Sequence, residues 1–417
     1  MTGDERRDGL YLVVVKLLDV AARAGFILSA TYALPIDQAG QFGLLTTLVA
    51  LFAFGFNFER HIDIQRRTAG QPYEVFDRYV SSAMGFFAFN WALMTPLFIG
   101  AALLLAHIRP EMALFAAVIV IGEHISNQAY YFALVSRRYY PLLLVVTAKN
   151  LLLVAAVLYE ALLSGRGLGL DFVLPVWAAG AVLCTLALGL MWLRLRQAAP
   201  RETPFHFATD ILGQHKASGI HFLLGLIGVL VLQYDRLAVG ALMSLDQVGV
   251  YFRHAALVSM AYQMFSVVSF NRLMPAMFAA ARTEPLPVLR TRAWREYLKV
   301  LLATPLLFAG LWLADRITGG IWSERFHLTL PLIAIMLVGF MLRAAADLGG
   351  LILNALSLER EILKLQGAAF AAGAVLLALL TWRFGVYGAG IATAVTAGLY
   401  LVLIRLRIEQ QTRKDPA

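Results

Sequence analysis

Several apolar stretches of this chain carry charged and amide side chains whose chemistry suits ligand binding. Lys16, Asp19 and Arg23 share one such stretch, and Glu123 and Asn127 share another. A charge at the centre of a bilayer costs roughly 2.5–3.5 kcal/mol on insertion scales, so these groups must face protein or water. A guanidinium binds phosphate oxygens in pairs, and amides bond to sugar hydroxyls. The residue types therefore indicate binding of a phosphorylated, glycosylated ligand.

Helical spacing places these groups on defined faces. At 100° per residue, Lys16 and Arg23 lie about 20° apart, and Asp19 lies within about 60° of both. All three are predicted to share one face of a helix.

The second stretch carries two polar stripes. Glu123, Asn127 and Tyr130 line one, and His124 and Gln128 begin the next. We therefore expect two neighbouring polar faces on one helix.

Across all apolar stretches, cations outnumber acids by about three. The cations are Lys16, Arg23, Lys149, Arg236, Arg253, Arg272 and Arg343, and the acids are Asp19, Glu123, Asp235 and Asp347. A buried cation without a partner is unfavourable, so water in a cavity or an anionic ligand is expected to compensate it.

The alternative is a set of structural ion pairs. Arg343 and Asp347 stand at i,i+4, and Asp19 is within reach of Lys16 or Arg23. The acids Asp19, Glu123, Asp235 and Asp347 are also candidates for carrying a coupling proton or sodium ion. The sequence leaves these readings open.

The composition is that of an integral membrane protein. Of 417 residues, 60% are hydrophobic and 15% are charged, against about 45–50% and 25% in soluble domains. The formal charge of +9 comes from short clusters between apolar runs, which argues against nucleic acid as a partner. His124 and His254 lack further ligands at fixed spacing, and Cys184 stands alone, so neither a metal site nor a cofactor is expected.

Twelve segments are long and apolar enough to be predicted as spanning helices. They are 9–33, 38–58, 79–106, 111–135, 141–163, 172–194, 217–242, 247–277, 297–315, 328–356, 364–383 and 387–405. One alternating set of links holds 23 basic residues and the other holds five. The positive-inside rule then places both termini in the cytoplasm, with the first segment retained as a helix.

One short motif occurs twice, at equivalent places in the two halves. Asp37-Gln38-Ala39-Gly40-Gln41-Phe42 follows the first segment, and Asp246-Gln247-Val248-Gly249-Val250-Tyr251 follows the seventh. Six helices separate the copies, which predicts parallel repeats about an axis along the membrane normal. We therefore expect six-helix bundles at 1–195 and 217–417, joined by a cytoplasmic linker at 196–216.

With this architecture, the stretch from Leu232 to Tyr251 resembles the polysaccharide flippases of the MOP exporter superfamily, in the Wzx-like (PST, polysaccharide biosynthesis) branch. The likeness rests on Gln233-Tyr234-Asp235-Arg236 before a small-residue helix end, and then on a Gly-x-Tyr turn. The first half supplies the counterpart at 37–42.

The resemblance implies a function and a set of site residues. It implies alternating access that carries an undecaprenyl-pyrophosphate-linked oligosaccharide from the cytoplasmic to the outer leaflet of the bacterial inner membrane. This transport would serve exopolysaccharide, capsule or O-antigen synthesis. The implied partners are membrane lipid and the polymerase and chain-length proteins of the same pathway. By this resemblance Arg23 and Arg253 would contact the pyrophosphate. The polar residues of the apolar stretches themselves add further candidate contacts, which are Lys16, Lys149, Arg272, Glu123, Asn127 and Gln128.

Two other functions are compatible with parts of the sequence. A cation-coupled multidrug exporter would share the fold, but the cationic surplus disfavours organic cations as cargo. A polytopic polymerase or acyltransferase would need catalytic residues near a water-exposed face, and the outer links are short. The prediction is therefore a transporter without covalent chemistry.

Overall fold

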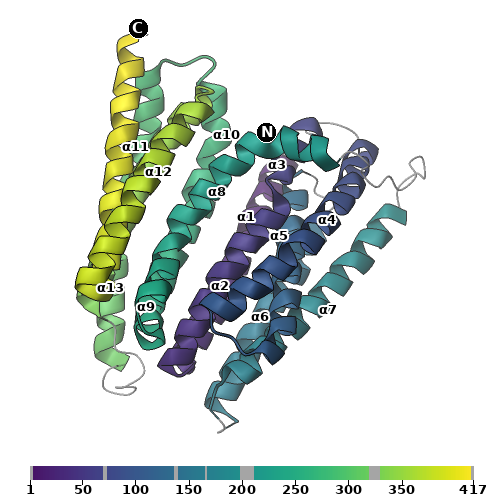
Figure 1. Ribbon diagram of the computed structural model, residues 1–417. Coiled ribbons are helices and arrows are strands. Elements are labelled where there is room, and N and C mark those ends of the chain that lie inside the picture. The colour runs from purple at the N-terminus through teal and green to yellow at the C-terminus, as the bar shows by residue number, and fades with distance from the viewer. Residues whose placement is uncertain are drawn as a thin grey trace. The chain divides into compact units, whose positions relative to one another are not determined.

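The computed structural model describes residues 3–68, 73–135, 140–164, 167–197, 211–318 and 329–414. Within these ranges the chain is helical, without strands, and divides into two compact units, Met1–Leu230 and Val231–Ala417 (Figure 1). The predicted linker lies largely outside the described residues. Its end, from Ile211 on, forms the first turns of a long helix.

The first unit contains the helices that hold most of the candidate site residues. They are α1 (Gly3–Ala33), α2 (Ile36–Asn57), α3 (Arg60–Thr68), α4 (Tyr73–Leu105), α5 (Ala113–Val135), α6 (Tyr140–Leu162), α7 (Leu170–Gln197) and the first part of α8 (Ile211–Leu242), with a 3-10 turn, η1, at Pro110–Met112. α1 packs on α6, and α5 packs on α2, α4, α6 and α7. α5 is thus the central helix of this unit.

The second unit contains the rest of α8 and the C-terminal helices. They are α9 (Leu245–Phe265), a π-helical turn η3 (Ser266–Phe270), α10 (Asn271–Ala280), α11 (Leu286–Thr318), α12 (Leu330–Ala355) and α13 (Glu359–Lys414). α12 packs on α9, α11 and α13. The predicted segment 247–277 therefore comprises three pieces, with a π turn in the middle.

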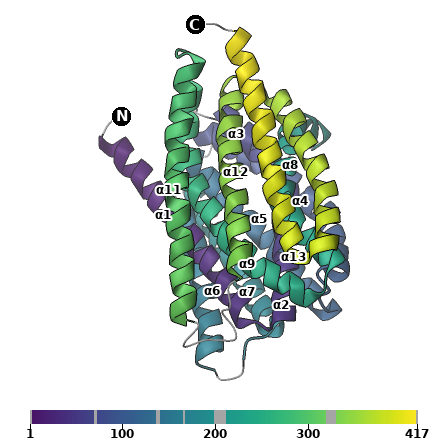
Figure 2. The ribbon, with the colours of Figure 1, turned by 90° about the vertical axis from the view of Figure 1, so that its left-hand side faces the viewer.

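α13 is a helical hairpin. Its backbone breaks at Gly385, where φ is 59°. A Cβ on Gly388 would overlap the carbonyl oxygen of Leu380, and one on Gly373 would overlap Thr396. In a straight helix residues 373 and 396 would stand about 34 Å apart, so the two arms run antiparallel (Figure 2). The arms hold the predicted segments 364–383 and 387–405.

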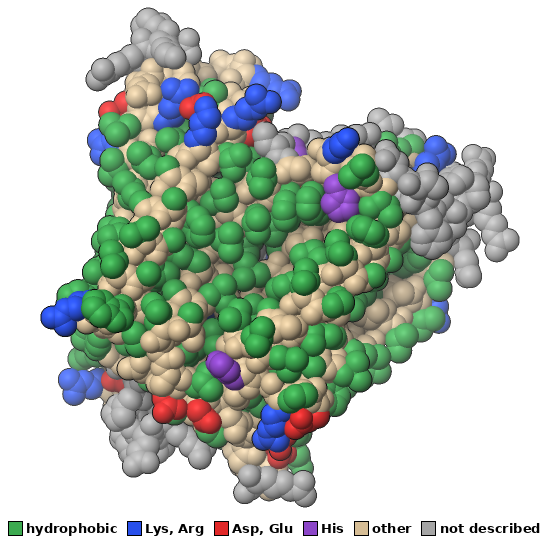
Figure 3. Space-filling view, in the orientation of Figure 1, with side chains coloured by type: hydrophobic (Ala, Val, Ile, Leu, Met, Phe, Trp, Pro, Cys, Tyr) green, Lys and Arg blue, Asp and Glu red, His purple; other side chains and the backbone are tan. Residues whose placement is uncertain are grey.

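Nine helices of the described chain are long and apolar enough to cross a membrane. α1 and α9 are not among them, because their charges lower the apolar character of the predicted spans 9–33 and 247–277. The count of twelve spans thus stays a prediction. Hydrophobic side chains cover most of the visible surface of each unit, and charged ones gather near the helix ends (Figure 3). Such a surface suits a multi-pass membrane protein.

The repeated motif starts a helix in both units. Asp37 lies in the first turn of α2, and Asp246 lies in the first turn of α9. An acid there interacts favourably with the positive end of the helix dipole. Gln38 adds a second role, since its Oε1 accepts a hydrogen bond from the backbone N of Leu170 at 2.9 Å, at the start of α7.

Candidate functional site

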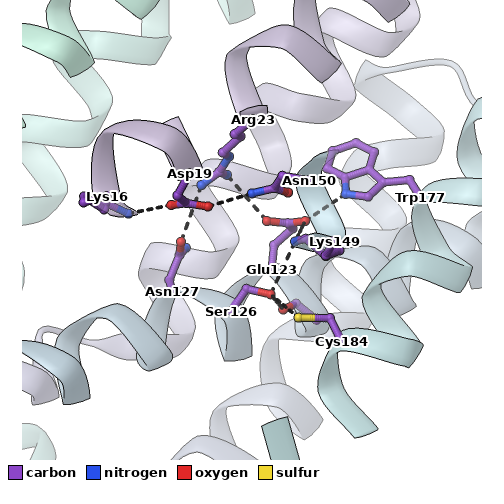
Figure 4. Close-up of polar contacts among 11 residues, drawn as sticks. Lys16, Asp19, Arg23, Glu123, Ser126, Asn127, Lys149, Asn150, Trp177 and Cys184 are labelled. Atoms are coloured by element: carbon purple, nitrogen blue, oxygen red, sulfur yellow. Dashed lines mark hydrogen bonds and ion pairs between the residues drawn. The ribbon is translucent and has the colours of Figure 1, made fainter. Parts of the chain in front are cut away.

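A network of charged and amide side chains joins α1, α5, α6 and α7 inside the first unit (Figure 4). Glu123, on α5, is its centre and is 3% exposed. Lys149 Nζ lies 2.7 Å from Glu123 Oε1, and the indole N–H of Trp177 donates to the same oxygen at 2.8 Å. Burying either charge alone would be strongly unfavourable, and the ion pair with its additional hydrogen bonds compensates for the lost hydration.

A second ion pair lies beside the first. Lys16 Nζ lies 2.9 Å from Asp19 Oδ2, and Asn150 donates to Asp19 Oδ1 at 2.8 Å. Lys16 also lies over the ring of Tyr130, 4.1 Å from its centroid. Asp19 is therefore neutralised by Lys16, as in the alternative in which the charges of this helix form structural ion pairs.

Arg23 is the surplus cation of the network. Its Nη1 donates to Asn127 Oδ1 at 3.4 Å, and its Nη2 lies 3.8 Å from Glu123 Oε2. Both contacts are long beside the 2.7–2.9 Å typical of charge-assisted hydrogen bonds. Its side chain is 34% exposed, against 3% for Lys149 and 19% for Lys16. The expectation of cations without internal partners is corrected here: Arg23 has partners, but weak ones.

Aromatic packing positions this network. Phe26 lies three residues after Arg23 and packs edge-on against Trp177, with ring centroids 5.3 Å apart. Phe42 of α2 packs against both rings. These ring contacts join α1, α2 and α7 around Trp177, whose indole N–H bonds to Glu123 of α5.

Gln128 belongs to a separate network on the next stripe of α5. Its amide nitrogen donates to Asn57 Oδ1 at 3.1 Å and lies 3.1 Å from His124 Nε2. Trp91 donates to the other ring nitrogen of His124 at 3.2 Å. Both stripes predicted on this helix exist, and they serve different networks.

The candidate residues of the second unit form two further groups. Arg343 and Asp347 pair at 2.9 Å on α12, and Tyr262 of α9 donates to Asp347 Oδ2 at 2.6 Å. Asp235 accepts a hydrogen bond from Tyr251 at 2.6 Å, while the guanidinium of Arg236 contacts neutral oxygens of Gln233 and Ser259. Arg343 and Asp347, one of the structural pairs that the sequence left open, are thus paired in the structure.

The two remaining candidates are less defined. Arg253 is partly exposed on α9, and the side chain of Arg272 lies outside what the structure describes. Among the described residues no group of three or more His, Cys, Asp or Glu side chains is placed to hold a metal ion.

Sequence reasoning missed some members of these networks. Trp177 reads as an apolar core residue, and only the fold brings its N–H to Glu123. Asn57 stands at the end of an apolar helix and shows no spacing signal.

Comparisons with known proteins give the fold. No protein-family model matches this sequence, and no curated protein matches it. Among solved structures, the lipid II flippase MurJ in an inward closed conformation is similar with a TM-score of 0.73 and 10% identity, over 95% of this chain and 87% of that chain. A MATE family multidrug resistance transporter of the MOP superfamily is similar in its inward-facing conformation (TM-score 0.70, 14% identity, 96% of each chain). An outward-facing conformation of a MATE family multidrug resistance transporter is similar with a TM-score of 0.63 and 14% identity, over 96% of this chain and 95% of that chain.

At 10–14% sequence identity, these structural similarities establish the fold of the chain. The chain has the all-α fold of MOP-superfamily membrane transporters. Its nine described apolar helices agree with a multi-pass membrane protein.

Proposed function

We propose that this protein is a Wzx-like flippase of the bacterial inner membrane. It carries an undecaprenyl-pyrophosphate-linked oligosaccharide from the cytoplasmic to the outer leaflet for exopolysaccharide, capsule or O-antigen synthesis. Both termini are cytoplasmic, and no covalent bond is made or broken. The similarity in fold to a lipid II flippase supports movement of a lipid-linked substrate.

The observation that carries the proposal is the state of Arg23. Three cations and two acids meet in the first unit, and Arg23 is the most exposed and most weakly paired cation among them. A guanidinium with long contacts can turn its fork to two phosphate oxygens without losing a strong bond. Asn127, already within 3.4 Å of Arg23, is placed to bond an adjacent oxygen or sugar hydroxyl.

The other candidate residues then take distinct roles. Glu123 and Lys149 are buried, so they position Arg23 and α1 rather than meet the ligand. Lys16, which is partly exposed, adds positive charge near the site. Arg253 and Arg272 are proposed to supply the contacts of the second unit. Alternating access further requires that the substrate bind the inward- and outward-open states with different affinity.

A multidrug exporter is the second candidate, because MATE transporters share the fold. An exporter of organic cations needs unneutralised acids in its site. Asp19 and Glu123 are each bonded to a lysine at 2.9 Å or less. The network therefore favours an anionic ligand over a cationic one.

The experiment is polymer export in cells that depend on this protein. Arg23→Glu reverses the exposed cation, and we expect it to abolish export at normal expression. Arg23→Lys should retain part of the activity, because lysine keeps the charge but loses the bidentate fork. Arg109→Glu is the matched control, since Arg109 is 72% exposed and far from this network in sequence and contacts. Full export by Arg23→Glu would refute the assignment.

A further inference from the structure

The first unit contains a cavity that the charged network does not use. Its volume is about 210 Å³, and it lies between α4, α5 and α7, with Leu142 of α6 at one wall. The lining side chains include Phe87 and Trp91 of α4, Ile125 of α5, and Leu188 and Trp192 of α7. α5 separates it from Glu123 and Arg23, because the cavity meets the His124–Gln128 stripe instead.

The walls of this cavity offer little to a polar ligand. Nearly all of the lining surface is apolar, and the His124 ring already contacts Trp91 through Nδ1 and Gln128 through Nε2. Among the polar lining atoms that the structure describes, Gln128 Oε1 is a buried acceptor without a hydrogen-bond partner. Apolar cavities stay dry and take up apolar molecules, because water finds too few hydrogen-bonding partners there. The cavity therefore selects for hydrocarbon.

The cavity is open on one side, within the membrane-spanning part of α4 and α7. Trp91, Thr185 and Gly189 are partly exposed at this opening. The helix surfaces that flank the lining are apolar and exposed, with Ala88 on α4, one turn after Met84, and Leu193 on α7, one turn after Gly189 and 48% exposed. The opening is thus continuous with the surface that the spans present to lipid.

We propose that this cavity is a binding site for one hydrocarbon chain of a bilayer lipid, held between α4 and α7. A cavity of about 150 Å³ suffices for benzene, so 210 Å³ accepts a chain segment of several methylenes. A chain that leaves the bilayer for the cavity is not transferred out of water, so its binding comes from the close van der Waals contacts of the cavity walls. The site is independent of the transported molecule and of Arg23.

The test uses the full chain in detergent, titrated with a phospholipid that bears a photoactivatable diazirine at mid-chain. After irradiation, adducts are mapped to residues by mass spectrometry. We expect adducts on Ile125 and Leu188 that saturate at low lipid content. Adducts on Leu97, which is 62% exposed on the same unit, should rise in proportion to lipid.

A filling variant distinguishes a built site from ordinary lipid contact. Gly189 has open space where a Cβ would stand, so Gly189→Leu can enter the cavity without a backbone clash. A leucine side chain that occupies the cavity should remove the saturable part of the adducts on Ile125 and Leu188 and leave only the part that rises in proportion to lipid. Gly100→Leu is the control, because Gly100 also has open space around it but does not line the cavity.

Two results would overturn the proposal. Adducts on Ile125 and Leu188 could rise linearly with those on Leu97, or they could persist unchanged in Gly189→Leu. If that variant fails to fold, Ala129→Leu fills the same cavity from α5 and must give the same loss. Neither filling variant should alter binding of the transported substrate, so this test fails or succeeds separately from the proposed function.

Discussion

Glu123 and Lys149 show how this protein keeps charge inside a helical bundle. The two side chains are 4% and 3% exposed and bond at 2.7 Å. Trp177 and Ser126 supply further contacts, to Glu123 and Lys149 respectively. Such a pair adds little net stability, but removing one partner leaves the other as an uncompensated buried charge.

Single substitutions in this pair should therefore destabilise more than the double substitution. We expect Glu123→Ala to cost about 3–5 kcal/mol of unfolding free energy, because Lys149 loses its counter-charge. Glu123→Gln with Lys149→Met removes both charges at similar volume and should be less destabilising than the sum of its single changes. Thermal unfolding of the natural protein, Glu123→Gln, Lys149→Met and the double variant in detergent measures the coupling between the two residues. Additive effects would show that the pair does not act as a unit.

The ion pairs that the sequence left open as alternatives are present in the structure where the contact is local. Arg343 and Asp347 are one turn apart, so their pairing follows from helical geometry. The pairing of Lys16 with Asp19 follows from the same geometry. The partners of Glu123 lie 26 and 54 residues away, on α6 and α7, and no spacing rule reaches that far. The sequence thus showed that the charges need partners, but not which residues provide them.

At the scale of elements, α13 shows what a hydropathy pattern can and cannot define. Two apolar segments separated by three residues were predicted as two helices. The structure joins them in one tight hairpin in which Gly385 adopts the left-handed conformation that glycine tolerates best. The hydropathy pattern predicts both apolar helices. It does not predict how closely the two arms pack, because that depends on which glycines face the other arm.

Substitution at this hairpin should be costly at one glycine and mild at another. A Cβ on Gly388 would overlap the backbone of Leu380, which cannot move aside as a flexible side chain could. On Gly398 a Cβ would meet only Leu342, at an ordinary 3.6 Å. We expect Gly388→Ala to reduce the folded yield and lower the unfolding temperature, while Gly398→Ala behaves as the natural protein does. Equal stability of the two variants would contradict the tight hairpin.

α1 and α9 depart from the other spans for a chemical reason. α1 carries Lys16, Asp19 and Arg23, and α9 carries Arg253 beside His254 together with amide and hydroxyl side chains, so the hydropathy of both helices is lower than that of a simple spanning helix. In α1 the structure shows the compensation: its charged face lies against α5 and α6. The charges that made α1 improbable as a lipid-exposed helix are those that build the candidate site.

For the whole molecule, the repeated motif makes a topological prediction. Asp37 and Asp246 are both exposed, and each begins a helix. The distribution of basic residues predicts that both lie on the outer face. In a chain with Cys184→Ala, a cysteine at either position should react with an impermeant thiol reagent added outside intact cells. A cysteine at Lys364, which is 72% exposed, should react only after the membrane is opened. Reaction at only one of the two aspartate positions would break the parallel repeat.

The central claim is movement of a lipid-linked oligosaccharide between leaflets, and reconstitution tests it most directly. Purified protein is placed in liposomes that contain undecaprenyl-pyrophosphate-linked oligosaccharide. A membrane-impermeant reagent then measures the fraction of sugar accessible from outside. We predict that this fraction rises above the outer-leaflet share with the natural protein and with Arg109→Glu, and stays at that share with Arg23→Glu. An accessible fraction that is the same with the natural protein as in protein-free liposomes would contradict the account.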